Sequence, residues 1–463
     1  MRAALVNTNR IRPPIAPVGL EYCAQALSAS GCAVETLDLC WEDDPAGAVE
    51  RFFRSRVFDL VGVTLRNIDD SACASRRSFL PDFRGMIAEI RKATEAVIIL
   101  GGVGFSIAPE DILELCPADG GVWGDGEGAL VALSRAVGGG PDWRRGPGLV
   151  RRSGAGYRRN PPAFSPLDSF PRGERKFFDH RRYFREGGQA GFETKRGCSA
   201  ACVFCADPLA KGRSVRLRSP ALVAEEVAGL LAQGIDHLHT CDSEFNLPES
   251  HAREVCREFV RKGLSEKMRW YAYCSPRPFS RVLARLMKRA GCAGIDFGAD
   301  GADDRMLKSL GRAFTGDDVL AAARICREEG IAVMLDLLLG APGETKESLV
   351  RTIEAMKGGA ADRVGIALGV RVYPGTILAR RLAGKEEGMI GGTGPFDPPY
   401  YLDPAVAPFA AELIDRLIAN DRRFLFFDPA RPERNYNYDA NRVLEEAIRK
   451  GYRGAYWDIL RRI

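Results

Sequence analysis

The sequence predicts an α/β protein with two successive parallel-sheet domains and a mainly helical tail. Short β-rich apolar runs alternate with amphipathic helical patterns over residues 1–140, and the same alternation returns over residues 186–390. This rhythm is typical of parallel strands that are connected by helices. The length of 463 residues also exceeds what one ordinary hydrophobic core accommodates.

Residues 1–140 form the first predicted domain, a Rossmann-like (flavodoxin-like) sheet with helices on both faces. The strand candidates are Ala3–Asn7, Ala33–Asp38, Leu60–Thr64 and Val97–Leu100, and the helix candidates are Val18–Ser30, Ala46–Ser55 and Asp82–Ala93. Ligands of such sheets bind at the carboxyl ends of the strands. The loops that follow these strands are therefore candidate binding segments.

Residues 141–185 are rich in Arg, Gly and Pro, which predicts a linker with one small hairpin around Gly148–Tyr157. The second array then begins, and six β-α units over residues 186–390 predict a partial (β/α)6 barrel with its site at the carboxyl strand ends. Its strand candidates are Gly191–Thr194, His237–Thr240, Arg269–Cys274, Gly294–Phe297, Ala332–Leu339 and Arg363–Val372. Its helix candidates are Ala221–Gln233, His251–Lys262, Ser280–Ala290, Gly316–Glu329 and Thr345–Lys357. Residues 391–463 lose this rhythm and are predicted to be a helical extension with aromatic clusters.

The composition argues against a nucleic-acid-binding, membrane-spanning or secreted protein. The 66 basic and 61 acidic residues give a net charge of +5, which is too mild to indicate a nucleic-acid partner. No apolar run has transmembrane length, and no signal peptide is expected at the start of the chain. Thirteen scattered cysteines, an odd number, indicate reduced thiols and hence a cytoplasmic protein.

Three closely spaced cysteines are the strongest functional signal. Cys198, Cys202 and Cys205 follow the pattern C-x3-C-x2-C, with Phe204 directly before the last of them. Three thiolates can hold three irons of a [4Fe–4S] cube and leave the fourth iron open to another ligand. The alternative is a zinc knuckle, but no His or Cys is close enough in the sequence to complete a set of four ligands. Other cysteines, including Cys241, Cys274 and Cys292, are expected to be small core residues.

The cysteine loop resembles that of the radical S-adenosylmethionine (SAM) enzymes. In that family the open iron is chelated by the amino and carboxylate groups of SAM, which is cleaved to a 5′-deoxyadenosyl radical. The resemblance continues over residues 188–380, and it implies that Phe204 lies in the cofactor site. Asp242, in Thr240-Cys-Asp-Ser-Glu-Phe-Asn246, stands where the family accepts a hydrogen bond from the SAM amino group. A solvated acidic loop is the alternative for this segment.

Two later segments extend the resemblance to the SAM site. Asp300, in Phe297-Gly-Ala-Asp, takes the place of a Glu that contacts the ribose, although Asp is one carbon shorter. Arg312 matches a basic residue near the SAM carboxylate, with an exposed helix-flanking charge as the alternative. Gly340 and Pro342, in Leu339-Gly-Ala-Pro-Gly-Glu-Thr345, resemble the turn beside the adenine, where Gly permits close approach to a flat ring.

The first domain resembles the cobalamin-binding domain that precedes many radical SAM enzymes. The matching loops are Gly- and Pro-rich and follow predicted strands, so their amides can approach a large ring and its phosphate tail. The residues that the resemblance assigns to cobalamin are Leu20, Thr64, Arg66, Asn67, Gly101, Gly102, Gly124, Gly126 and Glu127. A vestigial domain that binds nothing is the alternative.

The first domain also departs from classical B12 proteins. The four histidines are His180, His237, His239 and His251, so residues 1–179 hold no imidazole that could bind cobalt from below. Arg66 lies on a loop that could reach the lower face, where a cation without a lone pair would prevent ligation. A phosphate or propionamide contact is the alternative for Arg66.

The resemblances imply a cobalamin-dependent (class B type) radical SAM enzyme with a [4Fe–4S] cluster, SAM and cobalamin as cofactors. The first expectation is a methyltransferase that acts on a carbon centre of a small molecule through a 5′-deoxyadenosyl radical and methylcobalamin. Flavodoxin or ferredoxin is the expected electron donor, and no nucleic acid or membrane span is expected.

Other functions remain open at the level of the sequence. The first alternative is cyclisation, oxidation or rearrangement with the same cofactors, including lipid ring formation. RNA methylthiolation is a further alternative, although the front cysteines lack cluster spacing and no β-barrel rhythm follows residue 390. A corrinoid or iron–sulfur carrier is the alternative outside the enzymes, but a carrier has no use for the SAM motifs.

Overall fold

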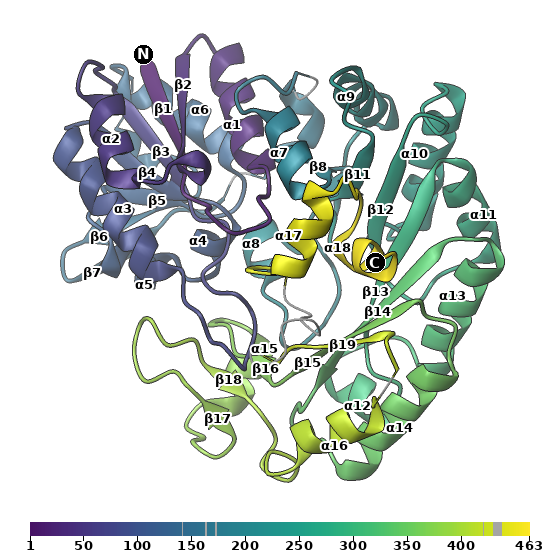
Figure 1. Cartoon of the computed structure of the whole chain (residues 1–463). Coiled ribbons are helices and arrows are strands. Elements are labelled where there is room, and N and C mark those ends of the chain that lie inside the picture. The colour runs from purple at the N-terminus through teal and green to yellow at the C-terminus, as the bar shows by residue number, and fades with distance from the viewer. Residues whose placement is uncertain (141, 163, 172–173, 420, 429–437) are drawn as a thin grey trace.

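The computed structural model describes residues 1–463 except 141, 163, 172–173, 420 and 429–437. Two seven-stranded sheets dominate it, one in each half of the chain, with a small three-stranded sheet below them (Figure 1). The α/β class and the order of the domains predicted from the sequence are confirmed.

The first sheet has the strand order β2-β1-β3-β4-β5-β6-β7, parallel through β5. Its parallel strands are β1 (Arg2–Asn7), β2 (Ala33–Asp38), β3 (Leu60–Thr64), β4 (Val97–Gly101) and β5 (Gly120–Val122). Its helices are α1 (Val18–Ala29), α2 (Pro45–Phe53), α3 (Leu80–Ala93), α4 (Val103–Ile107), α5 (Pro109–Leu115) and α6 (Gly126–Val137).

Alternate residues of these strands pack into two hydrophobic cores, one on each face of the sheet. Ala4 and Val6 of β1 pack under α2 and α3, whereas Ala3 and Leu5 pack under α1 and α6. Successive side chains of a strand point to opposite faces, so an apolar run without alternation is buried on both sides. This arrangement leaves the loops at the carboxyl edge of the sheet free to bind a ligand.

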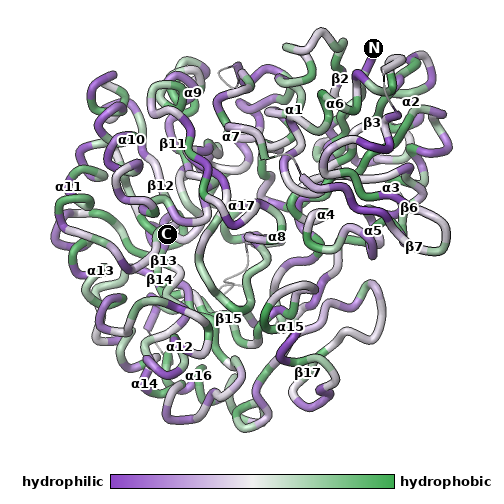
Figure 2. Tube along the Cα trace, turned by 180° about the vertical axis from the view of Figure 1, so that it is seen from behind, coloured by the Kyte–Doolittle hydropathy of each residue, from purple (hydrophilic) through white to green (hydrophobic). Residues whose placement is uncertain are grey.

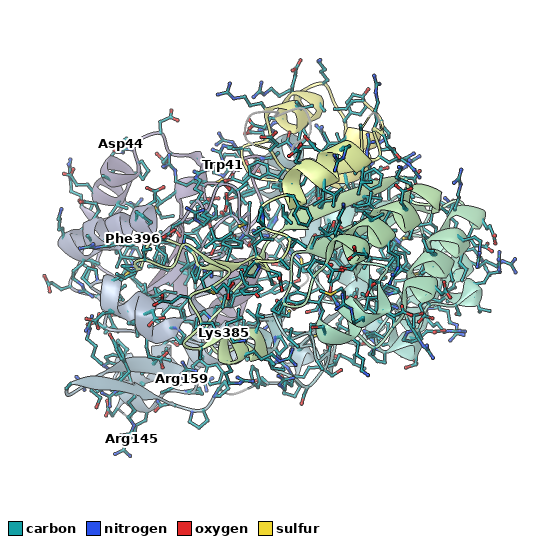
Figure 3. All side chains as sticks on the ribbon, turned by 90° about the horizontal axis from the view of Figure 1, so that it is seen from below. Trp41, Asp44, Arg145, Arg159, Lys385 and Phe396 are labelled. Carbon is teal, nitrogen blue, oxygen red and sulfur yellow. The ribbon has the colours of Figure 1, made fainter. Side chains whose placement is uncertain are left out.

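The predicted hairpin is present as β6 (Leu149–Ser153) and β7 (Gly156–Arg159), which pair antiparallel with each other. It extends the first sheet, because β6 also pairs with β5. Figure 3 shows Arg145 and Arg159 at this outer edge of the first domain. Arg159 forms an ion pair with Glu110 of α5 at 2.6 Å.

The second sheet has the order β19-β15-β14-β13-β12-β11-β8 and is parallel throughout. Its strands are β8 (Ala190–Phe192), β11 (His237–Thr240), β12 (Arg269–Cys274), β13 (Cys292–Asp300), β14 (Ala332–Leu339), β15 (Arg363–Leu368) and β19 (Phe424–Phe426). Six of them belong to the predicted array, as expected for a partial barrel. The seventh, β19, comes from the C-terminal extension.

Helices cover the outer face of the second sheet (Figure 1). They are α9 (Pro220–Ala232), α10 (Glu249–Arg261), α11 (Arg281–Arg289), α12 (Asp304–Ser309), α13 (Gly316–Glu328) and α14 (Lys346–Gly358). Figure 2 shows hydrophilic and hydrophobic residues alternating along α10, α11 and α13, as expected for helices with one buried face. The largest core of the protein lies between these helices and the outward-facing strand residues.

Shorter elements complete the chain. They are α7 (His180–Gly187), β9 (Lys195–Arg196), α8 (Asp207–Lys211), β10 (Arg216–Leu217), β16 (Val370–Arg371), α15 (Ile377–Leu382), β17 (Met389–Ile390), β18 (Tyr400–Tyr401), α16 (Ala410–Leu417), α17 (Arg442–Arg449) and α18 (Tyr456–Arg461). The helix α18 reaches the inner face of the barrel. A Cβ at Gly294 would lie 2.6 Å from the ring of Trp457, so only glycine leaves room for that indole. Within the described part of the chain, no helix is long and apolar enough to cross a membrane.

Candidate functional site

A cavity of about 700 Å³ lies between the first domain and the barrel. Its walls come from loops at the carboxyl ends of β1, β3, β4 and β5 and from barrel residues that include His239 and Tyr273. The structure brings together, along this cavity, all nine residues that the sequence assigns to cobalamin: Leu20, Thr64, Arg66, Asn67, Gly101, Gly102, Gly124, Gly126 and Glu127. This volume and its position at a doubly wound sheet are typical of a cofactor site.

Gly102, which follows β4, allows the backbone of its loop to contact the backbone of the loop after β3. Gly102 has φ of 99°, and a Cβ there would lie 2.4 Å from the carbonyl oxygen of Leu65. Such a φ is costly for any residue with a side chain. The loops after β3 and β4 can therefore lie directly against each other, and their backbones face the cavity.

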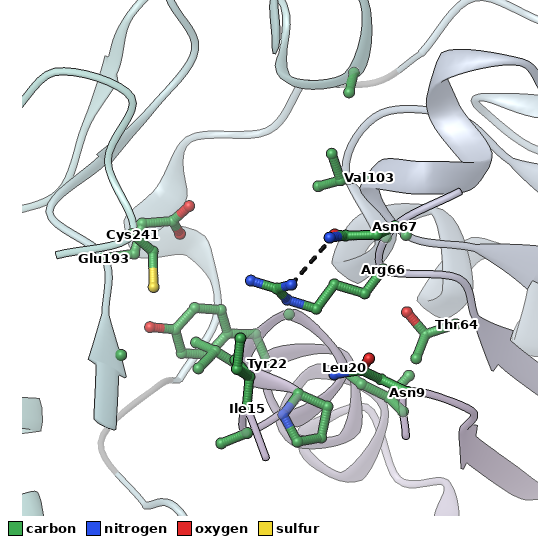
Figure 4. Close-up of a pocket in the computed structure, with 18 of the residues that line it drawn as sticks. Asn9, Ile15, Leu20, Tyr22, Thr64, Arg66, Asn67, Val103, Glu193 and Cys241 are labelled. Atoms are coloured by element: carbon green, nitrogen blue, oxygen red, sulfur yellow. Dashed lines mark hydrogen bonds between the residues drawn. The ribbon is translucent and has the colours of Figure 1, made fainter. Parts of the chain in front are cut away.

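Arg66 extends from the loop after β3 across the cavity toward Cys241 and Glu193 of the barrel side (Figure 4). Its guanidinium donates a hydrogen bond to Oδ1 of Asn67 at 3.2 Å, and among the described residues it forms no ion pair. Burial lowers the pKa of Arg66, an effect opposed by Tyr438, Cys241 and Tyr273. A half-buried guanidinium that has no carboxylate partner within the described part of the chain can bind an anionic or polar group of a ligand.

The cysteine loop is fixed by backbone contacts on both sides. Gly197, directly before the first cysteine, has φ of 97°, and a Cβ there would lie 2.2 Å from the carbonyl oxygen of Ser214. The amide of Val203 donates to Leu310 at 3.0 Å, and its carbonyl accepts from Leu378 at 2.8 Å. These contacts hold the loop at the carboxyl edge of the barrel.

The loop also touches the first domain. The helix α8, which begins two residues after Cys205, packs against α4. Asp207 and Lys211 of α8 line the cavity and form an ion pair at 2.9 Å. The cysteine loop therefore lies at the border of the cavity rather than at a remote site.

The three thiols lie near one another and are half-buried. Burial raises the pKa of Cys202 to about 11 and that of Cys205 to about 12, and it also raises the pKa of Cys198. At neutral pH such thiols ionise only when a metal binds. Among the described residues, no three His, Cys, Asp or Glu side chains are placed to hold one metal ion. In a [4Fe–4S] cube each of three thiolates binds a different iron.

The predicted SAM residues Asp300 and Arg312 lie beside the cysteine loop and bind each other. Asp300 ends β13 with φ of 57° and accepts a short hydrogen bond from Nε of Arg312. The Nη1 atom of Arg312 donates to Sγ of Cys202 at 3.1 Å, and its guanidinium lies 5.5 Å from the ring centroid of Phe204. Burial alone would lower the pKa of Arg312, but Asp300 raises it, so the guanidinium stays charged.

Asp242 and the turn after β14 also lie at the carboxyl edge. Asp242 accepts bonds from the amides of Thr194 at 2.8 Å and Lys195 at 3.2 Å, and a short one from the Thr194 hydroxyl. Much of its accepting capacity thus serves to position β9. In the turn, Gly340 has φ of 86° and donates its amide to Glu344 at 3.0 Å, while the Pro342 carbonyl accepts from Ser309 at 3.4 Å.

Glu244 is a site residue that was not predicted from the sequence. Its Oε2 atom is buried and has no hydrogen-bond partner among the described residues. Burial raises its pKa to about 7, and its charge interacts with those of Arg312, Cys198 and Cys202. A carboxylate left without a protein partner beside three cysteines is available to iron or to the cationic end of SAM, so the residues present fit a cluster and SAM. The sequence feature that could have indicated Glu244 is its position two residues after Asp242 in the same loop.

His239 and Cys241 are further cavity residues that were not predicted from the sequence. In the sequence, both alternate with the apolar or small residues of β11, a pattern that places them on the face of the sheet opposite to the core. The Nδ1 atom of His239 hydrogen-bonds to the carbonyl of Thr240 at 2.7 Å, and burial lowers its pKa to about 4. Cys274 and Cys292 are core residues as predicted, but Cys241 is not, because its thiol is exposed toward the cavity.

The chain matches two family models in the order that the motifs predict. The B12 binding domain matches residues 5–134, and the Radical SAM superfamily matches residues 192–356. The first match ends within α6, and the second spans the cysteine loop, Asp242, Asp300 and Arg312.

Similar proteins extend over most of the chain. Tryptophan 2-C-methyltransferase from Streptomyces laurentii is 33% identical over 449 residues, which cover 83% of this chain and 75% of that protein. The radical SAM methyltransferase TsrM from Kitasatospora setae, solved with tryptophan and aza-SAM, superposes with a TM-score of 0.92 at 33% identity, covering 99% of this chain and 97% of that one. Its structure with cobalamin and a [4Fe–4S] cluster gives a TM-score of 0.91 at 31% identity and the same coverage.

The expected cofactors and reaction class are therefore confirmed. The chain belongs to the cobalamin-dependent radical SAM methyltransferases, and it is an enzyme that uses a [4Fe–4S] cluster, SAM and cobalamin to methylate a carbon atom of a small molecule.

Proposed function

We propose that the small molecule is an indole amino acid, tryptophan or a close derivative, methylated on a ring carbon. A tryptophan 2-C-methyltransferase is 33% identical to this chain, and the TsrM structure that is 33% identical to it was solved with tryptophan bound. The observation in this chain that supports the proposal is a flat aromatic wall. The ring of Tyr273 is 41% exposed although it stands on the inner face of the barrel, and its centroid lies 4.8 Å from that of His239.

Six aromatic side chains line the same cavity: Tyr22, Phe79, Tyr273, Tyr438, Tyr456 and Trp457. Planar rings prefer offset-stacked or edge-to-face contacts with other aromatic rings. A planar, mostly apolar substrate therefore matches this wall better than a sugar or a phosphate ester. These rings come from α1, the loop before α3, β12, the segment before α17 and α18, so a substrate in contact with them would lie between the two domains.

The residues of the chain hold and orient the cofactors. When bound, the cluster and SAM supply single-electron chemistry, and cobalamin carries the methyl group. Cys198, Cys202 and Cys205 hold the cluster, while Arg312 keeps a positive charge beside Cys202. Asp242, Asp300, Gly340 and Pro342 stay predicted SAM contacts, and Glu244 joins them as the carboxylate with a free oxygen.

Incubation of the reconstituted enzyme with tryptophan, cobalamin, a reductant and trideuteromethyl-SAM tests the substrate. Mass spectrometry is expected to find tryptophan that carries the labelled methyl group on its ring. Protein with Cys202→Ala serves as the control and should give none. Absence of label in tryptophan and in its ring-substituted derivatives would refute the proposed substrate class.

The products formed from SAM distinguish radical methylation, methylation without a substrate radical, and other radical reactions. S-adenosylhomocysteine together with 5′-deoxyadenosine supports methylation through the predicted deoxyadenosyl radical. S-adenosylhomocysteine without deoxyadenosine indicates methyl transfer that needs no hydrogen abstraction from the substrate. Deoxyadenosine alone would instead favour cyclisation, oxidation or rearrangement.

Cobalamin is expected to bind without a nitrogen ligand from the protein. The first domain holds no histidine, and Arg66 has no lone pair to offer a metal. The EPR spectrum of the cob(II)alamin form should therefore lack superhyperfine splitting from nitrogen. Arg66→Ala should open the lower face to water and shift the visible spectrum.

His239→Ala is the control for this experiment, because His239 is the histidine that the structure places in the cavity wall. Its spectrum should match that of the wild type. A nitrogen triplet in the wild type that disappears in His239→Ala would contradict the prediction. A triplet that persists in this variant would assign the nitrogen to the tail base of cobalamin.

We also infer a cytoplasmic enzyme that receives electrons from flavodoxin or ferredoxin. The thirteen cysteines are free thiols, which supports a reducing compartment. Either donor in place of a chemical reductant should sustain methylation, and failure of both would contradict this inference.

A further inference from the structure

A guanidinium group lies against the middle cysteine of the cluster loop. The Nη1 atom of Arg312 donates a hydrogen bond to Sγ of Cys202 at 3.1 Å, although the two residues are 110 positions apart in the chain. The bond is charge-assisted, because an arginine side chain keeps its positive charge in a protein. The fold therefore places a fixed cation and an N–H donor at one ligand of the cluster.

Asp300 and two aromatic rings fix the position of this guanidinium. Asp300 accepts a short hydrogen bond from its Nε atom. The ring centroids of Phe204 and Phe314 lie 5.5 and 5.6 Å from its central carbon. The side chains of Arg312 and Asp300 are 11% and 7% exposed, so water competes little with these contacts. The donor is thus held toward the sulfur before any ligand binds.

The backbone supports the same contact. Asp300 has φ of 57°, a conformation that is costly for a residue with a side chain and that is kept here by the surrounding structure. Two residues before Arg312, the carbonyl of Leu310 accepts a hydrogen bond from the amide of Val203 at 3.0 Å. This bond ties the segment that carries the arginine to the cysteine loop.

The contact with sulfur is additional to the SAM contact that the resemblance assigns to Arg312. A guanidinium has five N–H donors in a planar fork. The bonds to Asp300 and Cys202 use two of them, one at Nε and one at Nη1. The other donors are left for the carboxylate of SAM.

We propose that Arg312 raises the reduction potential of the [4Fe–4S] cluster through its hydrogen bond to Cys202. Reduction adds one electron from an external donor and makes the cluster more negative. A positive charge and an N–H donor at a ligand sulfur both stabilise that added charge. Asp300 moderates the effect, because its carboxylate cancels part of the charge of the guanidinium. This inference rests on Cys202 as a cluster ligand and is independent of the proposed substrate.

A redox titration of the holoenzyme with dithionite, in the absence of SAM, tests the inference. EPR of the reduced cluster gives the ratio of reduced to oxidised cluster at each potential. In Arg312→Gln this ratio should fall about tenfold at a fixed potential, as for the loss of a hydrogen bond to a charged group. A tenfold change is a shift of about 59 mV, here toward more negative potential.

Asp300→Asn should shift the potential in the opposite direction. The guanidinium then keeps its contact with Cys202 but loses its counter-charge, so the cluster becomes easier to reduce. Asparagine also tolerates a positive φ, which keeps the backbone of this position intact. General damage to the fold is not expected to shift the potentials of the Arg312 and Asp300 variants in opposite directions.

Arg305→Gln is the matched control, because Arg305 is an exposed arginine of α12, in the same segment as Arg312. Its potential should equal that of the wild type. A wild-type potential in Arg312→Gln overturns the inference, and so do shifts of the same sign in Arg312→Gln and Asp300→Asn. Weaker SAM binding by Arg312→Gln at an unchanged potential would assign the arginine to SAM alone. If Arg312→Gln does not retain its cluster, the direction of the shift in Asp300→Asn decides.

The iron content of Cys202→Ala tests the ligand assignment separately. Full iron content in that variant would remove both the proposed cluster ligand and this inference. An unchanged potential in Arg312→Gln, together with loss of iron in Cys202→Ala, would overturn this inference and leave the cluster ligands standing.

Discussion

Cys202→Ala is expected to abolish both the iron–sulfur chromophore and methyl transfer. Cys202 is central in the loop and accepts a hydrogen bond from Arg312 at 3.1 Å. A methyl group cannot bind iron, so one corner of the cube loses its ligand and Arg312 loses the thiolate that it faces. Iron content, the visible spectrum and SAM turnover measure the effect, and Cys198→Ala and Cys205→Ala should behave alike.

Cys326→Ala is the matched control for these variants. Cys326 lies in α13 and is fully buried in the core under the barrel helices. Replacing it removes one sulfur from a packed site and should lower stability by about 1 kcal/mol without changing iron content. Full iron content in Cys202→Ala would overturn the assignment of the cluster loop.

Glu226→Gln is expected to cause the largest loss of stability, about 3–5 kcal/mol. Glu226 lies in α9 with a fully buried side chain and accepts bonds from Arg175 at 2.9 Å and from the Tyr22 hydroxyl at 2.7 Å. It also pairs closely with Arg218, whose side chain is 2% exposed. Glutamine has nearly the same shape but no charge, so two buried guanidinium groups would lose their counter-ion.

Glu225→Gln is the control, because this neighbour is 58% exposed and lies 3.5 Å from Lys262 in a surface pair. Surface pairs contribute little, so its effect should stay below about 1 kcal/mol. Urea denaturation followed by circular dichroism compares the two variants. Equal midpoints for the wild type and Glu226→Gln would show that the buried network adds no stability.

The buried ion pairs of Glu226 also connect the two domains that form the cavity. Tyr22 belongs to α1 of the first domain, Arg175 follows the hairpin, and Glu226 and Arg218 belong to the barrel. The network therefore joins both domains on one side of the cavity. A second network does so close to Gly126, where Arg196 pairs with Glu127 and Asp125, each at 3.0 Å.

Much of the fold and the three cofactors could be predicted from local patterns in the sequence. The strands β2, β3, β11, β12 and β14 have the predicted bounds, because runs of β-branched and apolar residues between Gly, Pro and Asp signals are local features. The C-x3-C-x2-C loop and the glycines after β4 and β5 are recognisable within a few residues of the sequence. The cluster, SAM and cobalamin could thus be predicted from short segments.

Other elements depended on contacts between distant residues. The strand β19 has only three residues, and it becomes part of the barrel sheet because β15 offers it an open edge. The hairpin β6–β7 joins the first sheet for the same reason, through β5.

The sequence by itself determined the α/β class and the order of the two domains, and it predicted the cluster cysteines and the loops that line the cavity, since each follows from residue type and spacing along one segment. Only the tertiary structure decided which side chains meet. It paired Asp300 with Arg312, left an oxygen of Glu244 without a partner among the described residues, and placed Arg66 opposite Cys241. Strand register, helix packing and domain contact set these distances, and all three arise between residues that are remote in the chain.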